Sequence, residues 1–260
     1  MNARVEGGVH AYDSLFYEYQ RDGSARSARA LLPNVIAALG IRSVLDVGCG
    51  AGGWLSAYRA LGVTDCLGVD REYVDRTMLL IDQAIFCPRD ITRSFDFGRQ
   101  FDLVQCLEVG EHVPRQACDT LIDNIVRHGR MVLFSAAVPG QGGENHVNEQ
   151  PYEFWRDMFA ARGFHFFDFV RPTADGNDAI EPWYRYNMMF FAHDFVVGSL
   201  PPAIAATRVP DGAGIRDFSP AGYRLRKMVM RSLPDSTVSM MAVWKHRRVV
   251  RSLKRRRNLA

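Results

Sequence analysis

The sequence predicts a doubly wound α/β fold, in which a mostly parallel sheet is covered by helices on both faces. Three observations predict it. Short apolar segments alternate with stretches of helical apolar spacing from residue 26 to about residue 162, as in βαβ units. A glycine-rich loop follows the first apolar segment. Two last strands then follow one another with only a loop between them, which predicts an antiparallel pair at one edge of the sheet.

The elements can be assigned in order along the chain. The first helix is expected over 26–39, because Gly40 is a stop signal. A second helix is expected from the glycine loop through Leu61, and a helical stretch after Asp70. The remaining expected helices are 115–127 and 151–162, and the expected strands are 43–47, 66–70, 85–87, 101–106, 131–137, 164–170 and 186–193.

The composition is typical of a soluble globular protein. The chain has 260 residues, of which 47% are hydrophobic and 23% charged, and no apolar run reaches the roughly 18 residues of a membrane span. The N-terminus lacks the apolar core of a secretory signal. The five cysteines include no CxxC pair, so we expect reduced thiols, a cytoplasmic location and no metal site.

The charge is unevenly distributed. The net charge is +3, but residues 245–257 carry eight Lys and Arg residues and no acid. The rest of the chain has 24 basic and 29 acidic residues, which argues against nucleic acid as a partner. Residues 238–258 also contain apolar side chains. Two alternatives stay open for them: a basic helix in peripheral contact with the inner face of the membrane or with an acidic partner, and a solvated tail.

The loop after the first strand carries the first chemical signal. Residues 48–53 satisfy GxGxxG, which also occurs in dinucleotide-binding proteins. Asp46 lies two residues before the first glycine, where a carboxylate would repel a diphosphate and attract a positively charged amino group. Asp70 ends the second strand about 20 residues after the loop, where a carboxylate accepts ribose hydroxyls. Asp90, after the third strand, is placed to accept a hydrogen bond from an adenine amino group.

Together with further motifs, these residues make the sequence resemble the class I S-adenosylmethionine-dependent methyltransferases. Within them it is most similar to a bacterial subgroup that acts on small molecules and glycans. The motifs that carry the resemblance are VLDVGCGAGGWL (44–55), LGVD (67–70), RDI (89–91), FDLVQCLEVGEHV (101–113), SARALLP (27–33), LFSAAVPGQGGENHVNEQP (133–151) and WYRYN (183–187). The resemblance implies a seven-stranded Rossmann-like sheet with an antiparallel last strand.

The resemblance and the residue patterns together give an expected organisation and cofactor site. Residues 1–25 are expected to form a lid or arm, 26–197 the methyltransferase domain, 198–220 a linker and 221–260 a basic, helical tail. S-adenosylmethionine is the expected cofactor. Its expected contacts are Asp46, Gly48, Cys49, Gly50, Gly52, Trp54, Asp70, Arg71, Asp90, Ile91, Leu107 and Glu108.

The methyl acceptor is expected at the loops after the fourth and fifth strands. Glu111 and His112 lie in the first loop, and His146 lies in a polar, glycine-rich segment of the second. An imidazole suits proton transfer at neutral pH, so these three are the expected catalytic residues, with His146 as general base or acceptor ligand. The expected substrate contacts are Tyr17, Glu144, Asn148, Glu149, Trp183 and Tyr186. The spacing of His112, His146 and Glu149 matches no common metal motif.

The sequence therefore predicts an S-adenosylmethionine-dependent O-methyltransferase whose acceptor is a hydroxyl of a sugar or secondary metabolite. Two alternatives remain: N-methylation of a small amine, and an NAD-dependent oxidoreductase that uses the same loop. Asp46 argues against the oxidoreductase.

Overall fold

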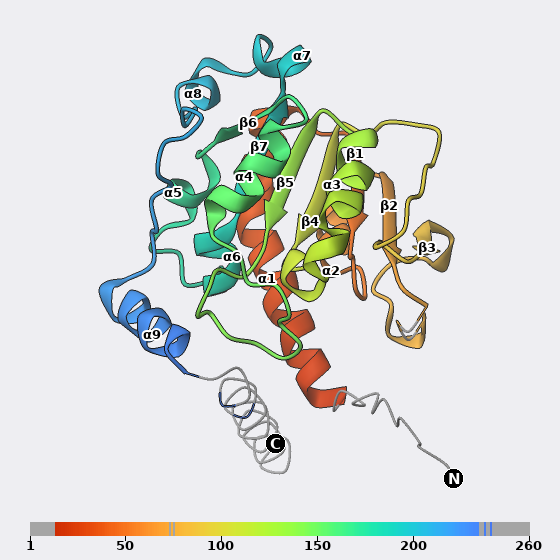
Figure 1. The fold of residues 1–260 in the computed structure, drawn as a ribbon. Helices are drawn as coiled ribbons and strands as arrows, with labels where there is room; N and C mark the ends of the chain where they lie inside the picture. The colour runs from red at the N-terminus through yellow and green to blue at the C-terminus, as the bar shows by residue number, and fades with distance from the viewer. Residues whose placement is uncertain (1–13, 73, 75, 234–236, 238–239, 241–260) are drawn as a thin grey trace.

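The computed structural model describes residues 14–72, 74, 76–233, 237 and 240, with side chains from residue 23 onward. A single seven-stranded sheet forms its centre (Figure 1). The strands are β1 (Ser43–Val47), β2 (Asp65–Asp70), β3 (Phe86–Pro88), β4 (Leu103–Leu107), β5 (Met131–Ser135), β6 (Phe164–Phe167) and β7 (Met189–His193).

The strand order is β3-β2-β1-β4-β5-β7-β6. Strands β1 to β5 pair in parallel, and β7 runs antiparallel to both of its neighbours, β5 and β6. The chain therefore leaves β1 toward β3 and returns on the other side through β4, so the switch point of the sheet lies between β1 and β4. Ligands of open α/β sheets bind at such a point. The predicted fold class, including the antiparallel last strand, is confirmed.

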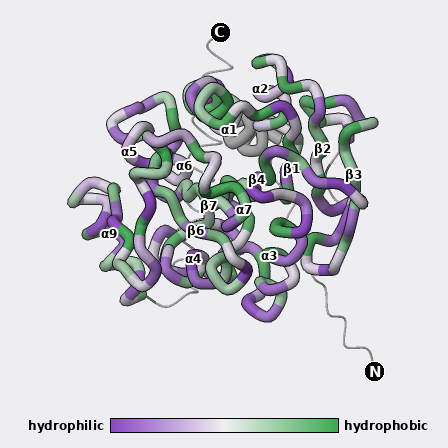
Figure 2. The backbone as a smooth tube through the Cα atoms, turned by 90° about the horizontal axis from the view of Figure 1, so that it is seen from above, coloured by the Kyte–Doolittle hydropathy of each residue, from purple (hydrophilic) through white to green (hydrophobic). Residues whose placement is uncertain are grey.

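Helices cover both faces of the sheet. Helices α1, α2, α5 and α6 lie on one face, and α3 and α4 lie on the other (Figure 2). The helices are α1 (Ser14–Leu39), α2 (Gly53–Ala60), α3 (Cys118–Arg127), α4 (Tyr152–Ala160), α5 (Val170–Ala174), α6 (Pro182–Asn187), α7 (Asp194–Val197), α8 (Pro202–Ala205) and α9 (Ala221–Arg231).

The core consists of two apolar layers, one on each face of the sheet. Strand β4 contributes to both layers: Leu103 and Leu107 belong to the layer under α1 and α2, and Val104 and Cys106 belong to the layer under α3 and α4, while its central residue is the buried, polar Gln105. Side chains alternate between the faces of a strand, so a strand buried on both faces is mostly apolar. This explains why the central strands could be located from the sequence.

The first helix begins well before the predicted residue 26. Helix α1 starts at Ser14, so the boundary predicted between an arm (1–25) and the domain falls inside a helix. Polar residues in the middle of this helix have partners in the body of the protein: the Ser24 hydroxyl lies 2.8 Å from the Tyr184 hydroxyl, and Arg26 forms an ion pair with Glu181. These partners lie far along the chain, so the local sequence gives no sign of them.

The region between the last two strands also differs from the prediction. Helices α5 and α6 lie between β6 and β7, and the last strand begins at Met189 rather than at residue 186. The aromatic segment before it is helical and buried, with Pro182 as its first residue. The helical stretch predicted after Asp70 consists of two short 3₁₀ turns, Arg76–Met78 and Gln83–Ile85.

The segment predicted as a linker (198–220) packs against the domain. The backbone N–H of Ile215 donates to Glu153 (2.8 Å), and Arg171 donates to the carbonyl of Arg216 (3.0 Å). The predicted basic segment 238–258 lies outside the described residues apart from Met240. Within the described part of the chain, no helix has the length and apolar character needed to cross a membrane.

Candidate active site

The glycine loop connects β1 to α2 at the switch point of the sheet. Gly48, Gly50 and Gly52 all have positive φ angles, of 84°, 53° and 79°. Side chains other than glycine rarely adopt this conformation. A Cβ at Gly48 would also lie 2.4 Å from a methyl group of Val109, and one at Gly52 would lie 2.7 Å from Ile81. These glycines therefore allow the tight turn and the close packing of the loop.

The first three N–H groups of this loop are hydrogen-bonded within the protein. The N–H groups of Gly48 and Cys49 both donate to the carbonyl of Val69, at 2.7 and 3.1 Å. The N–H of Gly50 donates to the carboxylate of Asp70 (2.7 Å). A loop that binds a diphosphate presents its N–H groups to the ligand. This loop presents two carboxylates instead, at Asp46 and Asp70.

Asp46 lies near the end of β1 and is only 3% exposed. Burial raises its pKa from 3.8 to about 7; the Gln105 amide opposes this shift, and the nearby charge of Asp70 adds to it. Among the described residues, no Lys or Arg forms an ion pair with it. A buried carboxylate without a cationic partner is energetically unfavourable, so the site is suited to a ligand that brings a positive charge.

Asp70, Arg71 and Asp90 lie together at the carboxyl ends of β2 and β3. Each Asp70 oxygen accepts one backbone N–H, from Gly50 and from Arg71, both at 2.7 Å. These bonds fix the orientation of the carboxylate beside the loop. Arg71 forms an ion pair with Asp90 (3.3 Å), which also accepts hydrogen bonds from the N–H and hydroxyl of Thr92. The hydroxyl bond from Thr92 is the main cause that lowers the pKa of Asp90.

The apolar members of the predicted cofactor set are buried. Cys49, Ile91 and Leu107 belong to the core layers. Trp54 is also buried and packs edge-on against Tyr184, with ring centroids 5.0 Å apart. For these four residues the structure shows a packing role in the core.

Glu108, directly after β4, joins a polar network that the sequence did not predict. Its φ is 55°, a left-handed conformation that is rare for a residue other than glycine. Its carboxylate accepts hydrogen bonds from the side-chain amides of Gln141 (3.2 Å) and Asn187 (3.3 Å), and Asn187 also donates to Gln141 (2.8 Å). Burial raises the pKa of Glu108, although hydrogen bonds from Ser135 and Asn187 act in the opposite direction.

The structure brings the three predicted catalytic residues together. One carboxylate oxygen of Glu111 and one ring nitrogen of each histidine, His112 and His146, lie within 4.8 Å of one another. The two imidazole rings meet edge to face at 5.0 Å. Glu111 is 1% exposed, and its Oε2 has no hydrogen-bond partner. Burial and then the neighbouring Glu108 carboxylate raise the pKa of Glu111 well above its ordinary value of 4.5.

The loop after β5 is held in place by the carboxylate of Glu149. It accepts the N–H groups of Gly140 and Gly142, both at 2.7 Å. Its Oε1 also lies 2.7 Å from Nδ1 of His146, which orients that ring. Burial would raise the pKa of Glu149, but the hydrogen bond and charge of His146, with the two backbone N–H groups, lower it. This ionised carboxylate positions His146.

The predicted substrate residues are placed in different ways. The buried amide of Asn148 donates to the Gly110 carbonyl (3.2 Å) and contacts Cys118 (3.1 Å), so it ties the loop to the protein. Trp183 is half-buried on α6, and the Tyr186 ring packs against Tyr223 at 5.8 Å. Glu144 lies half-buried in the loop after β5. Tyr17 lies in α1, but its side chain is outside the described residues.

Helix α9 packs directly on the loop after β5 (Figure 1). Arg226 donates to the carbonyl of Gln141 (3.0 Å). Gly140 has a φ of 80°, and a Cβ there would lie 2.2 Å from the carbonyl oxygen of Lys227. Only glycine therefore allows this contact. Lys227 is buried and forms an ion pair with Asp217 (2.6 Å), which links the helix to the segment before it.

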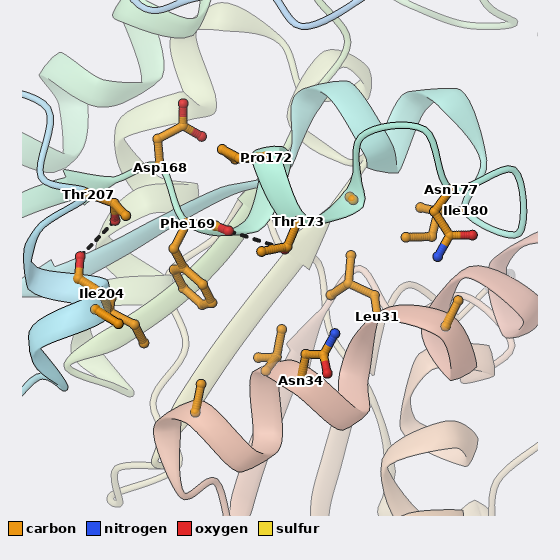
Figure 3. Close-up of a pocket in the computed structure, with 15 residues that line it drawn as sticks. Leu31, Asn34, Asp168, Phe169, Pro172, Thr173, Asn177, Ile180, Ile204 and Thr207 are labelled. Carbon is orange, nitrogen blue, oxygen red and sulfur yellow. Dashed lines mark hydrogen bonds between the residues drawn. The ribbon is translucent and has the colours of Figure 1, made fainter.

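A separate cavity of about 370 Å³ lies between α1, α5 and α8. Leu31 and Asn34 of α1 face Phe169 and Thr173 across it (Figure 3). Its lining includes none of the predicted site residues. It is therefore distinct from the site at the switch point.

Comparisons with known proteins agree with this geometry. Residues 16–168 match a family described as a methyltransferase domain. No curated protein sequence matches the chain. Among solved structures, the sugar N-methyltransferase KedS8 from Streptoalloteichus sp. is similar at 18% identity, with a TM-score of 0.54, over 74% of this chain and 98% of that one. Magnesium protoporphyrin IX methyltransferase (ChlM) from Synechocystis is similar at 16% identity, with a TM-score of 0.50, over 75% and 87%.

These structural similarities support the fold, and the family match identifies its kind. The match covers more than half of the chain, from α1 to the end of β6, and includes the glycine loop and the Glu111 loop. It confirms the resemblance that the residues after β1, β2, β3 and β4 carry. The chain belongs to the methyltransferase-domain family.

Proposed function

We propose that the chain transfers a methyl group from S-adenosylmethionine to a hydroxyl oxygen of a small polar molecule, most simply a sugar. One observation carries the cofactor assignment. In the glycine loop the N–H groups of Gly48, Cys49 and Gly50 donate to acceptors within the protein, and the buried carboxylate of Asp46 has no cationic partner among the described residues. This arrangement suits the ammonium group of S-adenosylmethionine and does not suit the diphosphate of NAD.

The residues present fit the rest of the cofactor. When bound, S-adenosylmethionine supplies an electrophilic methyl group on a sulfonium. Asp46 would hold its ammonium group. The Asp70 oxygens accept one backbone N–H each, and a carboxylate oxygen can accept more than one hydrogen bond, so Asp70 can also accept the ribose hydroxyls. Asp90, which Arg71 anchors beside it, would accept from the adenine amino group.

The acceptor belongs on the other side of the Glu108 network, where the two loops meet. Glu111, His112 and His146 converge there beside the polar side chains of the loop after β5. A hydroxyl oxygen that bonds to the methyl carbon must lose its proton, and this cluster is the proposed place where that proton is withdrawn. A hydroxyl acceptor is proposed because an enzyme that methylates a neutral amine has less need of such a cluster.

Two measurements test the proposal. Calorimetry should show binding of S-adenosylmethionine and no binding of NAD; the reverse result would reject the cofactor assignment. A panel of sugars and small phenols, with amino sugars included, should then accept labelled methyl groups from the cofactor. Transfer to amino groups alone would reject the hydroxyl acceptor.

His146→Ala tests the catalytic cluster. We expect kcat to fall by about 100-fold or more, in the range found for positioned acid–base groups, with the affinity for S-adenosylmethionine unchanged. His165→Ala is the matched control, because His165 is also paired with a carboxylate, Asp194 (2.6 Å), but lies on β6 away from the cluster. Full turnover in His146→Ala would remove His146 from the mechanism.

A further inference from the structure

We propose that Glu111, His112 and His146 bind one divalent transition-metal cation. The three candidate ligand atoms, one from each side chain, lie within 4.8 Å of one another. They come from the loops after β4 and β5, which meet at the carboxyl edge of the sheet. The site itself does not depend on the proposed function, which enters only in the role that the ion would have.

The strongest sign of a missing partner is at Glu111. Its side chain is 1% exposed, and Oε2 has no hydrogen-bond partner. A buried carboxylate oxygen without a partner is costly, and native proteins rarely contain one. A cation between Glu111 and the histidines would supply the absent partner.

The hydrogen bonds of the two histidines resemble those of metal ligands. Nδ1 of His146 lies 2.7 Å from Oε1 of Glu149, and Nδ1 of His112 lies 3.1 Å from the carbonyl oxygen of Asn145. Each acceptor takes an N–H from Nδ1, which leaves the lone pair on Nε2. Histidine ligands of metals commonly have this arrangement, with a carboxylate or backbone carbonyl behind the ring.

The distances are compatible with a site that closes on an ion. Two ligands that each lie about 2.1 Å from one ion are separated by roughly 3.0–3.4 Å, so shifts of about 1 Å would complete the set. Such shifts are within the reach of side-chain rotation. Glu111 is buried and His146 half-buried, but His112 is exposed, which gives an ion a path from solvent.

The ligand types indicate the class of ion. Two imidazoles and one carboxylate suit first-row ions such as Zn²⁺, Mn²⁺, Fe²⁺ and Co²⁺, and three protein ligands leave coordination positions open. An ion with open positions could hold the acceptor oxygen and favour the loss of its proton. His146 would then act as a ligand in the cluster rather than as a free base.

The test uses Co²⁺ alone as the probe. Tag-free full-length protein is treated with EDTA, dialysed and titrated with Co²⁺, and the visible absorption of the bound ion is recorded. We expect saturation at one Co²⁺ per chain. Glu111→Gln, His112→Gln and His146→Gln should each weaken binding at least tenfold, and His165→Gln should not change it. Absence of saturable binding, or wild-type affinity in all three variants, would overturn the proposal.

A further variant alters the space without removing a ligand. A Cβ at Gly143 would lie 2.1 Å from Nε2 of His146, so Gly143→Ala should displace that nitrogen and weaken Co²⁺ binding. Glu111 is buried, so Glu111→Gln could fail to fold. His112 is exposed, so His112→Gln still tests the site in that case. If Gly143→Ala and His112→Gln both fold and bind Co²⁺ with wild-type affinity, the proposed ligand set is overturned.

Binding of S-adenosylmethionine, measured on the same proteins, separates the two proposals. A protein that binds the cofactor and methylates at full rate after EDTA treatment has no catalytic metal, and the proposed function stands without it. A protein that binds Co²⁺ through these residues but does not bind the cofactor would retain the metal site and lose the proposed function.

Discussion

Asp46→Asn is expected to have opposite effects on stability and on cofactor binding. The folded protein buries Asp46, and burial is the main cause that raises its pKa from 3.8 to about 7. The ionised carboxylate is therefore disfavoured in the folded state relative to the unfolded chain. Its replacement by a neutral amide of similar shape removes this penalty. The same replacement removes the proposed partner of the cofactor's ammonium group.

The magnitude follows from the pKa change. A shift from 3.8 to about 7 corresponds to about 4 kcal/mol, at about 1.4 kcal/mol per pH unit. Because the folded pKa is the higher one, the carboxylate causes no penalty below pH 3.8, a growing penalty as pH rises toward 7, and a constant one above it. The stability of Asp46→Asn relative to wild type should therefore rise by up to about 4 kcal/mol between pH 4 and pH 8.

The ionised form of Asp46, which lowers the stability of the folded protein, should raise its affinity for the cofactor. If the ionised carboxylate binds the ammonium group, the affinity of wild type for S-adenosylmethionine should fall about tenfold for each pH unit below 7. Asp46→Asn should bind weakly, with little dependence on pH.

Urea unfolding at several pH values and calorimetry over the same range measure both effects. Equal relative stability of Asp46→Asn at pH 4 and pH 8 would refute the buried charge. Wild-type affinity in Asp46→Asn would refute its role as the partner of the ammonium group.

Three other predictions concern packing and positioning. Gly110→Ala should destabilise the protein by about 1–3 kcal/mol, because a Cβ there would lie 2.8 Å from the buried Trp155 ring; an unchanged urea midpoint would contradict this. Asp217→Asn leaves the buried Lys227 ammonium without its partner, so limited proteolysis should cleave α9 faster, and adding Lys227→Met should reverse the effect. Glu149→Gln should lower methyl transfer by about 10–100-fold with unchanged cofactor affinity, and an equal loss of both would indicate general unfolding instead.

The cofactor half of the site was predictable because its signals are local. The strand Ser43–Val47 was placed at its observed bounds, and the glycine loop follows it without interruption. Asp46 lies one residue before the end of β1 and Asp70 ends the neighbouring parallel strand β2, so topology alone brings them to the same edge of the sheet. The roles of the individual residues toward the cofactor remain predictions.

The acceptor half was predictable only in part. The sequence indicated Glu111, His112 and His146, which the fold brings together. It did not indicate Gln141 and Asn187, which contact each other across 46 residues of chain and therefore have no local signal. The type of a residue also does not tell whether its side chain points into the site or into the protein interior.

Asn148 and Ser24 of α1 show the same limit. Asn148 is polar and lies in the predicted loop, yet its amide bonds to the protein interior. Ser24 and Tyr184 are 160 residues apart, so their contact could not be read from the spacing around residue 24. Both features depend on tertiary contacts, which override local preference.

The contact of α9 with Gly140 has a consequence for how members of this family can diverge. The family match ends at residue 168, and the helix that covers the loop after β5 lies beyond it. New specificities could therefore arise by exchange of the C-terminal segment, while the cofactor half stays intact. Because a Cβ at residue 140 would lie 2.2 Å from the backbone of α9, the loop and the helix are not independent modules. A functional chimaera would have to inherit both from the same parent.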